Sequence, residues 1–145
     1  MGFTESIRSC YGQYATFSGR ASRSEFWFFR LFVILVLLVS ALPFFVFGEL
    51  NAHREPNFAA NPVQTILSLL GGLILLIVVA GSIIPLIAVA VRRVHDTNAS
   101  GWFVLIWYVP YIGSLVSLVW ACLPGTAGEN NYGPDPLGRV DKVFE

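Results

Sequence analysis

Three long apolar stretches divide the chain, and polar segments separate them. They cover residues 26–47, 63–91 and 102–123. Each is longer than the roughly 18 to 20 residues that a helix needs to cross about 30 Å of hydrocarbon. None carries the polar face, repeating every 3.6 residues or so, that a buried helix of a soluble protein would need. The pattern predicts an all-α integral membrane protein with three transmembrane helices.

Apolar positions also recur at helical spacing before the first of these stretches. Phe3, Ile7, Cys10 and Tyr14 would lie on one face of a helix. This predicts a short amphipathic N-terminal helix that lies on the membrane surface. A soluble helix that contacts a protein partner would show the same pattern.

The composition agrees with a membrane protein. Hydrophobic residues make up 55% of the chain and charged residues 12%, against about one quarter charged in soluble domains. The first apolar stretch follows 25 residues with several charges and is too long for a usual signal peptide, so we expect it to be kept. The nine basic and nine acidic residues balance, and this gives no reason to expect nucleic acid as a partner.

Orientation follows from the basic residues beside the spans, because basic loops stay in the cytoplasm. With three crossings, one side carries Arg8, Arg20, Arg23, Arg30, Arg92 and Arg93, and the other carries Arg54, Arg139 and Lys142. We therefore expect a cytoplasmic N-terminus and an external C-terminus. The single membrane domain would comprise a cytoplasmic segment 1–25, a span 26–47, an external loop 48–62, a span 63–91, a cytoplasmic loop 92–101, a span 102–123 and an external tail 124–145.

Charged residues gather in two cytoplasmic segments of this topology. They are "FSGRASRSEFWFF", which leads into the first span, and "VRRVHDTNASGWF", which joins the second and third. Ser22 and Glu25 fit a capping box at a helix start, and Gly19 would supply the turn before it. We expect a polar cluster formed by Arg20, Arg23, Glu25, Arg92, Arg93, His95 and Asp96.

Three roles for this polar cluster remain open. Its arginines could anchor the helices by reaching the lipid phosphates, with Asp96 pairing one of them and Trp102 in the interface. The planar guanidinium groups could instead bind a phosphate-bearing headgroup or an acidic partner peptide. A proton relay through His95 and Asp96 is the third, although no titratable path leads from them through the spans.

Catalytic and metal chemistry are not expected. His95, Asp96 and Ser100 are the residue types of a hydrolase triad, but no nucleophile-elbow glycine pattern surrounds the serine. In the expected topology the two histidines lie on opposite faces, as do Cys10 and Cys122, so neither a metal site nor a disulfide can form. We expect no enzyme activity and no cofactor.

Small residues inside the spans indicate helix packing. They recur four residues apart, which lets helix backbones approach where lipid supplies no hydrophobic driving force. The expected packing residues are Ser68, Gly72, Gly113, Ser117 and Ala121. Pro85 and Pro110 should kink the second and third helices.

Four motifs in order resemble a known family. They are "FSGRASRSEFWFF", "PLIAVAVRRVHDTNASGWF", "PYIG" and "LPGTAGENNYGPDP", spread from Phe17 to Pro136. They are similar to the successive motifs of the bacterial inner-membrane family called domain of unknown function 805, typified by the YhaH-like proteins. The resemblance implies a small multi-span protein of the bacterial inner (plasma) membrane and implies no activity.

Two functions are compatible with these observations. The first is a scaffold that uses the polar cluster to bind a protein partner or a lipid headgroup. The alternative is a subunit of an oligomeric transporter for lipids or small solutes, since three helices alone hardly enclose a path. The expected partners are membrane lipids and either another protein or further copies of this chain, but not nucleic acid.

Overall fold

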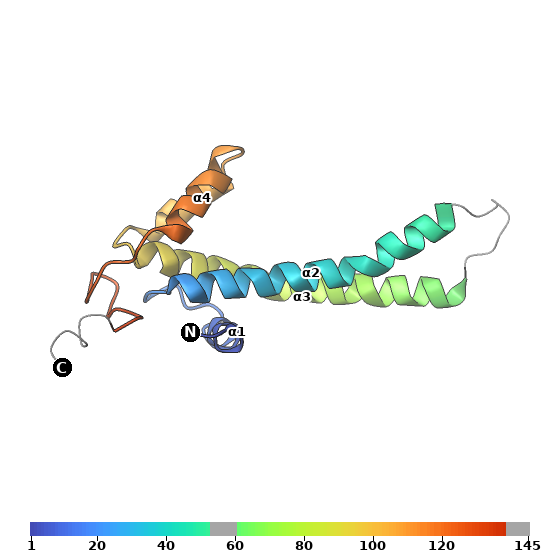
Figure 1. The fold of residues 1–145 in the computed structure, drawn as a ribbon, viewed down its shortest axis with the longest axis horizontal. Helices are drawn as coiled ribbons and strands as arrows, with labels where there is room; N and C mark the ends of the chain where they lie inside the picture. The colour runs from blue at the N-terminus through green and yellow to red at the C-terminus, as the bar shows by residue number, and fades with distance from the viewer. Residues whose placement is uncertain (53–60, 139–145) are drawn as a thin grey trace. The chain divides into compact units, whose positions relative to one another are not determined.

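The computed structural model describes residues 1–52 and 61–138, and this part of the chain is helical without a strand. In chain order the elements are α1 (Phe3–Gly12), α2 (Arg23–Ala52), α3 (Pro62–His95), the 3₁₀ helix η1 (Gly101–Tyr108) and α4 (Ile112–Cys122) (Figure 1). The chain forms two compact units, one of Met1–Arg30 with Ile84–Glu145 and one of Leu31–Ile83. The predicted all-α class is confirmed for the described residues. The predicted external loop lies largely outside them.

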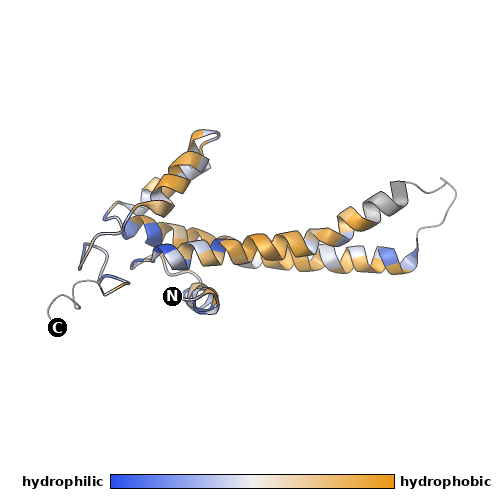
Figure 2. Cartoon of the chain, in the orientation of Figure 1, coloured by the Kyte–Doolittle hydropathy of each residue, from blue (hydrophilic) through white to orange (hydrophobic). Residues whose placement is uncertain are grey.

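Helices α2 and α3 are both long and apolar enough to cross a bilayer. With 30 and 34 residues they measure about 45 and 51 Å, more than the roughly 30 Å of the hydrocarbon layer. Figure 2 shows apolar residues along most of both helices. Leu38 and Leu69 are 60% and 68% exposed, and many neighbouring apolar side chains are similarly open. Such a continuous apolar surface suits contact with lipid rather than with water.

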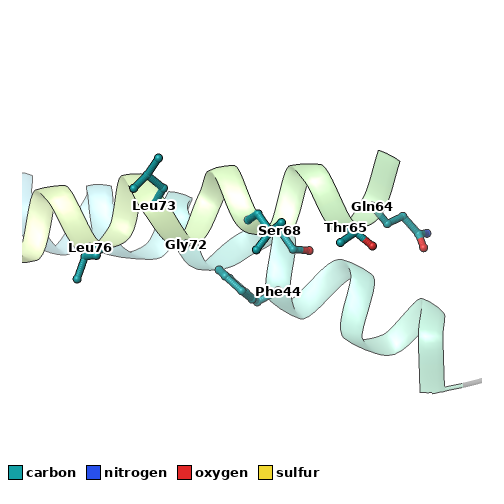
Figure 3. Close-up of a pocket in the computed structure, with 8 residues that line it drawn as sticks. Phe44, Gln64, Thr65, Ser68, Gly72, Leu73 and Leu76 are labelled. Carbon is teal, nitrogen blue, oxygen red and sulfur yellow. The ribbon is translucent and has the colours of Figure 1, made fainter. Parts of the chain in front are cut away.

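In the unit of residues 31–83, small residues let α3 approach α2 closely. A Cβ added at Gly71 would lie 3.4 Å from the Ser40 carbonyl oxygen, and one at Gly72 would lie 3.2 Å from the Phe44 ring. Ser68 and Gly72 also line a groove of about 550 Å³ beside Phe44 (Figure 3). These two predicted packing residues therefore lie where the helices meet and then separate.

The third apolar stretch is not one helix, and this part of the prediction is wrong. The chain forms η1, turns at Val109–Tyr111 and continues as α4. Pro110 disfavours a helical residue before it, and Val109 has φ −71° and ψ 125°, outside the α region. Tyr111 then has a positive φ of 67°. The expected kink at Pro110 is a full break, whereas α3 continues through Pro85.

Helix α4 folds back onto η1 (Figure 1). Gly113, Ser117 and Ala121 are its buried residues, so the predicted stripe of small residues lies in the contact within this hairpin. At Gly113 an added Cβ would lie only 2.2 Å from the Trp107 carbonyl oxygen. The two arms of eight and 11 residues are each about 16 Å long, too short to cross a bilayer.

Helix α1 packs on the beginning of α2 within the same unit. The Phe3 ring meets Phe28 edge to face at 6.0 Å, and Tyr11 meets Phe29 at 5.4 Å. Of the apolar face predicted for this segment, Cys10 is buried, whereas Tyr14 lies beyond the end of the helix. The predicted N-terminal helix is present and is attached to the start of α2.

Candidate functional site

Six charged or titratable side chains are buried together where the segment before α2 meets the end of α3. We call them the buried charged cluster: Arg20, Glu25, Arg92, Arg93, His95 and Asp96. Arg92 and Arg93 are only 1% and 0% exposed. Arginine is almost never buried so fully unless it is paired. The groups that pair with these buried arginines therefore indicate what the site can do.

Asp96 lies between two arginines, directly after the last turn of α3. Its Oδ1 accepts a hydrogen bond from Arg20 Nε at 2.9 Å and forms an ion pair with Arg20 Nη2 at 2.8 Å. Its Oδ2 accepts one from Arg93 Nη1 at 2.5 Å. The three side chains are at most 4% exposed. Water screens such ion pairs little, and removing one partner leaves an uncompensated buried charge.

Arg20 also binds the backbone of the C-terminal tail. Its Nη2 donates to the Thr126 carbonyl at 2.5 Å, and its Nη1 donates to the carbonyls of Gly128 at 2.6 Å and Gly133 at 3.2 Å. The N-terminal segment and the tail are thus in direct contact. The sequence predicted the tail on the opposite face of the membrane from the N-terminus and gave no sign of this contact, because backbone carbonyls carry no formal charge and do not register in a count of charged residues.

Both ends of the η1–α4 hairpin lie at the buried charged cluster. At its beginning, a Cβ added to Gly101 would lie 2.9 Å from His95 Nε2. At its end, Arg93 Nη2 donates to the Leu123 carbonyl, and Arg93 Nε donates to the Ala121 carbonyl at 3.4 Å. The beginning and the end of the hairpin therefore lie close together, at the same cluster.

Hydrogen bonds to backbone carbonyls hold the tail against the end of α3. The Thr126 amide donates to the Asp96 carbonyl at 2.8 Å, and Asn130 Nδ2 donates to the His95 carbonyl at 3.0 Å. These bonds satisfy carbonyls that a helix end leaves without partners. Gly125 passes so close that an added Cβ would lie 1.9 Å from Asp96 Oδ2. Only glycine fits this approach without moving the carboxylate.

Glu25 forms the second half of the cluster and connects it to α1. Its Oε1 accepts from Arg92 Nη1 at 3.2 Å, from Ser9 Oγ at 2.9 Å and from Cys10 Sγ at 3.7 Å. Arg92 Nη1 also donates to Gln13 Oε1 at 2.7 Å. Among the described residues, Arg92 Nε and Nη2 have no hydrogen-bond partner. The α1 helix is therefore held to α2 and α3 by polar contacts.

The expected capping box is half present. The Ser22 hydroxyl accepts from the Glu25 amide at 3.2 Å, as predicted. The Glu25 carboxylate turns instead to α1 and Arg92, because an ion pair to a buried guanidinium is stronger than a neutral cap. Gly19 does supply the turn before this helix start, with φ +88°.

Cys10 lies against Glu25 with its side chain fully buried. Burial, and then the nearby Glu25 carboxylate, raises the pKa of its thiol from 9.0 to about 12. Because folding favours the protonated thiol, its contribution to stability is complete below about pH 9 and is lost as the pH rises toward 12.

We expect N-ethylmaleimide at pH 8 to modify exposed Cys122 in the folded protein and to leave Cys10 unmodified, because the thiolate is the reactive form. Mass spectrometry of proteolytic peptides measures both sites, and unfolding in denaturant should make Cys10 reactive. Equal labelling of both cysteines in the folded protein would contradict the buried position of Cys10.

Two further arginines of this unit, Arg23 and Arg30, lie at the surface. Arg23 is exposed, and its Nη1 donates to the Cys122 carbonyl at 3.5 Å, which is a weak contact. The Arg30 guanidinium lies over the Phe26 ring at 5.8 Å. Arg23 was predicted to belong to the polar cluster, and the structure places it at the edge of that cluster.

His95 and Asp96 do not assemble a triad with Ser100. His95 Nδ1 lies 3.2 Å from the Gly19 carbonyl, and its ring stacks on Tyr132 at 3.8 Å. Asp96 is occupied by its arginines, and the described part of the chain offers the Ser100 side chain no capping hydrogen bond. Both side chains thus contact other segments of the fold and, among the described residues, make no hydrogen bond to Ser100.

Sequence reasoning missed the tail as part of this site. Thr126, Gly128, Asn130 and Gly133 all contribute backbone or side-chain contacts to it, and Asp135 lies 3.9 Å from Arg20. The one available signal was the regular run "LPGTAGENNYGPDP", whose glycines and prolines permit tight turns. Ser9 and Gln13 gave no signal, because single polar residues on a short helix are common.

Comparisons with known proteins agree with a membrane role. Inner membrane protein YhaI of Escherichia coli (strain K12) is 37% identical over 123 residues, which cover 85% of this chain and 87% of that protein. Inner membrane protein YhaH of the same strain is also 37% identical over 123 residues, 85% of this chain and 88% of that protein. No solved structure matches the chain.

A family profile covers most of the chain, including every residue of the buried charged cluster. It matches residues 14–134 and carries the description "Protein of unknown function (DUF805)". The match begins after α1 and ends within the tail that Arg20 binds. The chain therefore belongs to the DUF805 family, whose curated relatives named above are inner membrane proteins.

Proposed function

We propose that this chain is a non-catalytic binding protein of the bacterial inner membrane, anchored by two spans, α2 and α3. Its N-terminal segment, the η1–α4 hairpin and the tail would form a folded module at the cytoplasmic membrane surface. This module would present a binding surface for lipid or for a partner protein. The names of the curated relatives support the membrane assignment.

The buried charged cluster carries this proposal. Arg20 and Arg93 direct their donors to Asp96 and to backbone carbonyls of the hairpin end and the tail. Guanidinium groups that already bind these partners inside the fold are not available to bind lipid phosphates. We infer that the buried charged cluster stabilises the shape of the module. Binding would then use the outer surfaces of the segments that this cluster holds together.

A two-span topology also makes the distribution of basic residues between the two membrane faces more unequal. If the third apolar stretch returns to its starting face, eight of the nine basic residues lie on one side and only Arg54 lies on the other. The three-span arrangement divides them six to three. Because basic segments stay cytoplasmic, the two-span arrangement favours both termini in the cytoplasm.

Labelling with a membrane-impermeant thiol reagent tests this topology. In a variant without its own cysteines, a cysteine at Asn57 should react from the periplasmic side of cells with a permeable outer membrane. Cysteines at Thr97 and Asn131 should react only after the inner membrane is opened. Labelling at Asn131 in closed cells would restore an external tail and contradict the two-span proposal.

A transporter subunit has less support. Residues 31–46 and 61–83, which form the described core of the spans, contain no Asp, Glu, Lys, Arg or His. Ions therefore meet no titratable or charged group there. Native mass measurement in lipid nanodiscs, together with a solute-flux assay in liposomes, separates the two functions. A monomer without flux supports the binding protein, whereas a closed oligomer with flux supports the transporter.

A further inference from the structure

A pocket of about 550 Å³ lies beside the buried charged cluster, within the unit that contains α1 and the hairpin. Its walls come from the last turns of α3, from η1, from Phe17 before α2 and from Tyr132 in the tail. Trp102, Val104, Leu105 and Tyr108 supply most of the η1 side. Such a volume with apolar and aromatic walls is typical of small-molecule sites.

The pocket has one nearly buried polar group, His95, which is 8% exposed. Its Nδ1 lies 3.2 Å from the Gly19 carbonyl, and a carbonyl can only accept, so Nδ1 carries the proton. In the neutral ring, Nε2 is then an acceptor, and it has no hydrogen bond to the described residues. Gly101 beside it leaves this nitrogen uncovered, since a Cβ there would lie 2.9 Å away.

Ser100 adds a second unpaired group to the same end. This residue lines the pocket, and its side chain makes no capping hydrogen bond within the described chain. A serine hydroxyl can donate or accept. A ligand hydroxyl placed here could donate to His95 Nε2 and accept from Ser100 Oγ.

The residues that line the pocket also indicate the charge of the ligand. Among the described residues that line the pocket there is no Asp, Glu, Lys or Arg. Arg92 and Arg93, which follow the lining residue Val91 in the chain, are buried in their own ion pairs. An ionised group would lose its hydration here without gaining a counter-charge. The pocket therefore suits an uncharged ligand.

The position of the pocket indicates where such a ligand comes from. Ile87 and Val91 belong to the end of the apolar run of α3, and His95 follows after one more turn. Trp102 and Tyr108 are 79% and 67% exposed at its rim, as aromatic residues are at membrane–water interfaces. A chain entering between them would come from the bilayer.

We propose that this pocket binds a neutral membrane lipid with a free hydroxyl group, the chemistry of a diacylglycerol. An acyl chain lies along Trp102, Leu105 and Tyr108, and the hydroxyl is held between His95 Nε2 and Ser100 Oγ. This inference rests on the proposed binding function, for which it names the ligand class.

Photolabelling of the full chain in phosphatidylcholine nanodiscs at pH 8, where an ordinary imidazole is neutral, tests the proposal. The probes are a diacylglycerol, a phosphatidylcholine and a phosphatidylglycerol with the same diazirine-bearing acyl chain. Two hydrogen bonds should give the diacylglycerol probe about tenfold more labelling of η1 peptides than phosphatidylcholine. Unlabelled dioleoylglycerol should compete.

Three variants locate the site. Leu105→Trp fills the pocket and should abolish the preferential labelling, whereas Leu115→Trp, at a leucine of similar exposure on α4, should retain it. Ser100→Ala should reduce the preference for diacylglycerol without changing the labelling by phosphatidylcholine. Matched thermal unfolding of the variants shows that each is folded.

Equal labelling by diacylglycerol and phosphatidylcholine in the unmodified protein would overturn the hydroxyl site. Preferential labelling by phosphatidylglycerol would overturn the neutral ligand and indicate a headgroup site. Loss of labelling in Leu115→Trp as well as Leu105→Trp would overturn the assignment to this pocket. These outcomes leave the proposed binding function standing, whereas solute flux by a closed oligomer would overturn that function.

Discussion

Replacing Asp96 by Asn should destabilise the folded protein by about 3 to 5 kcal/mol, because Arg20 and Arg93 would remain buried without their shared counter-charge. The amide keeps one acceptor oxygen but presents its NH₂ group to the other guanidinium. We expect a lower midpoint of thermal unfolding in detergent. Glu129→Gln, which removes an exposed carboxylate in the same tail, should change the midpoint little.

A double-mutant cycle identifies the partner of Asp96. Arg93→Gln should recover part of the loss when it is combined with Asp96→Asn, because the pair is in direct contact. The sequence alone left open which arginine pairs with Asp96. In the structure Arg92 pairs with Glu25, so Arg92→Gln should add its own destabilisation to that of Asp96→Asn. Recovery with Arg92→Gln and additivity with Arg93→Gln would contradict these pairings.

Replacing Gly113 by Ala should open the η1–α4 hairpin. The added methyl group would lie 2.2 Å from the Trp107 carbonyl oxygen and 2.9 Å from that of Ile106. Both are backbone atoms, which cannot rotate away as a flexible side chain can. Overpacking of this kind costs about 1 to 3 kcal/mol and sometimes more. Thermal unfolding should show the loss, and Trp107 fluorescence should report a changed environment.

Gly81→Ala is the matched control. A Cβ at this position in α3 would meet nothing within 4 Å, and alanine is favoured over glycine in a helix by about 1 kcal/mol. Equal or greater stability is therefore expected for this variant. Unchanged stability of Gly113→Ala would show that α4 does not pack against η1 as the structure has it.

The helical class and the two long helices could be predicted from sequence because hydropathy and length are local properties. The predicted 26–47 and 63–91 lie inside α2 and α3. Their extra turns consist of residues such as Ser24 and Arg93, which an apolar window excludes although the backbone continues as helix. The boundaries therefore differ only at the polar ends.

Six of the seven predicted cluster residues are buried together, but their pairing could not be predicted. Proximity followed from topology, because the segment before the first helix and the end of the second meet when two helices run antiparallel. Whether Asp96 pairs with Arg92 or Arg93 depends on which side of α3 each arginine projects from. That is set by packing against α1 and the tail.

The amino-acid sequence by itself determined that this is a helical membrane protein of the DUF805 family, since apolar runs and ordered motifs are readable along the chain. Only the tertiary structure decided that the third apolar run turns back at Pro110 and that the tail returns to Arg20. Hydropathy measures how apolar a segment is and carries no information on its direction. The reversal depends on the backbone angles at Tyr111 and on carbonyls that only the folded chain brings to the buried arginines.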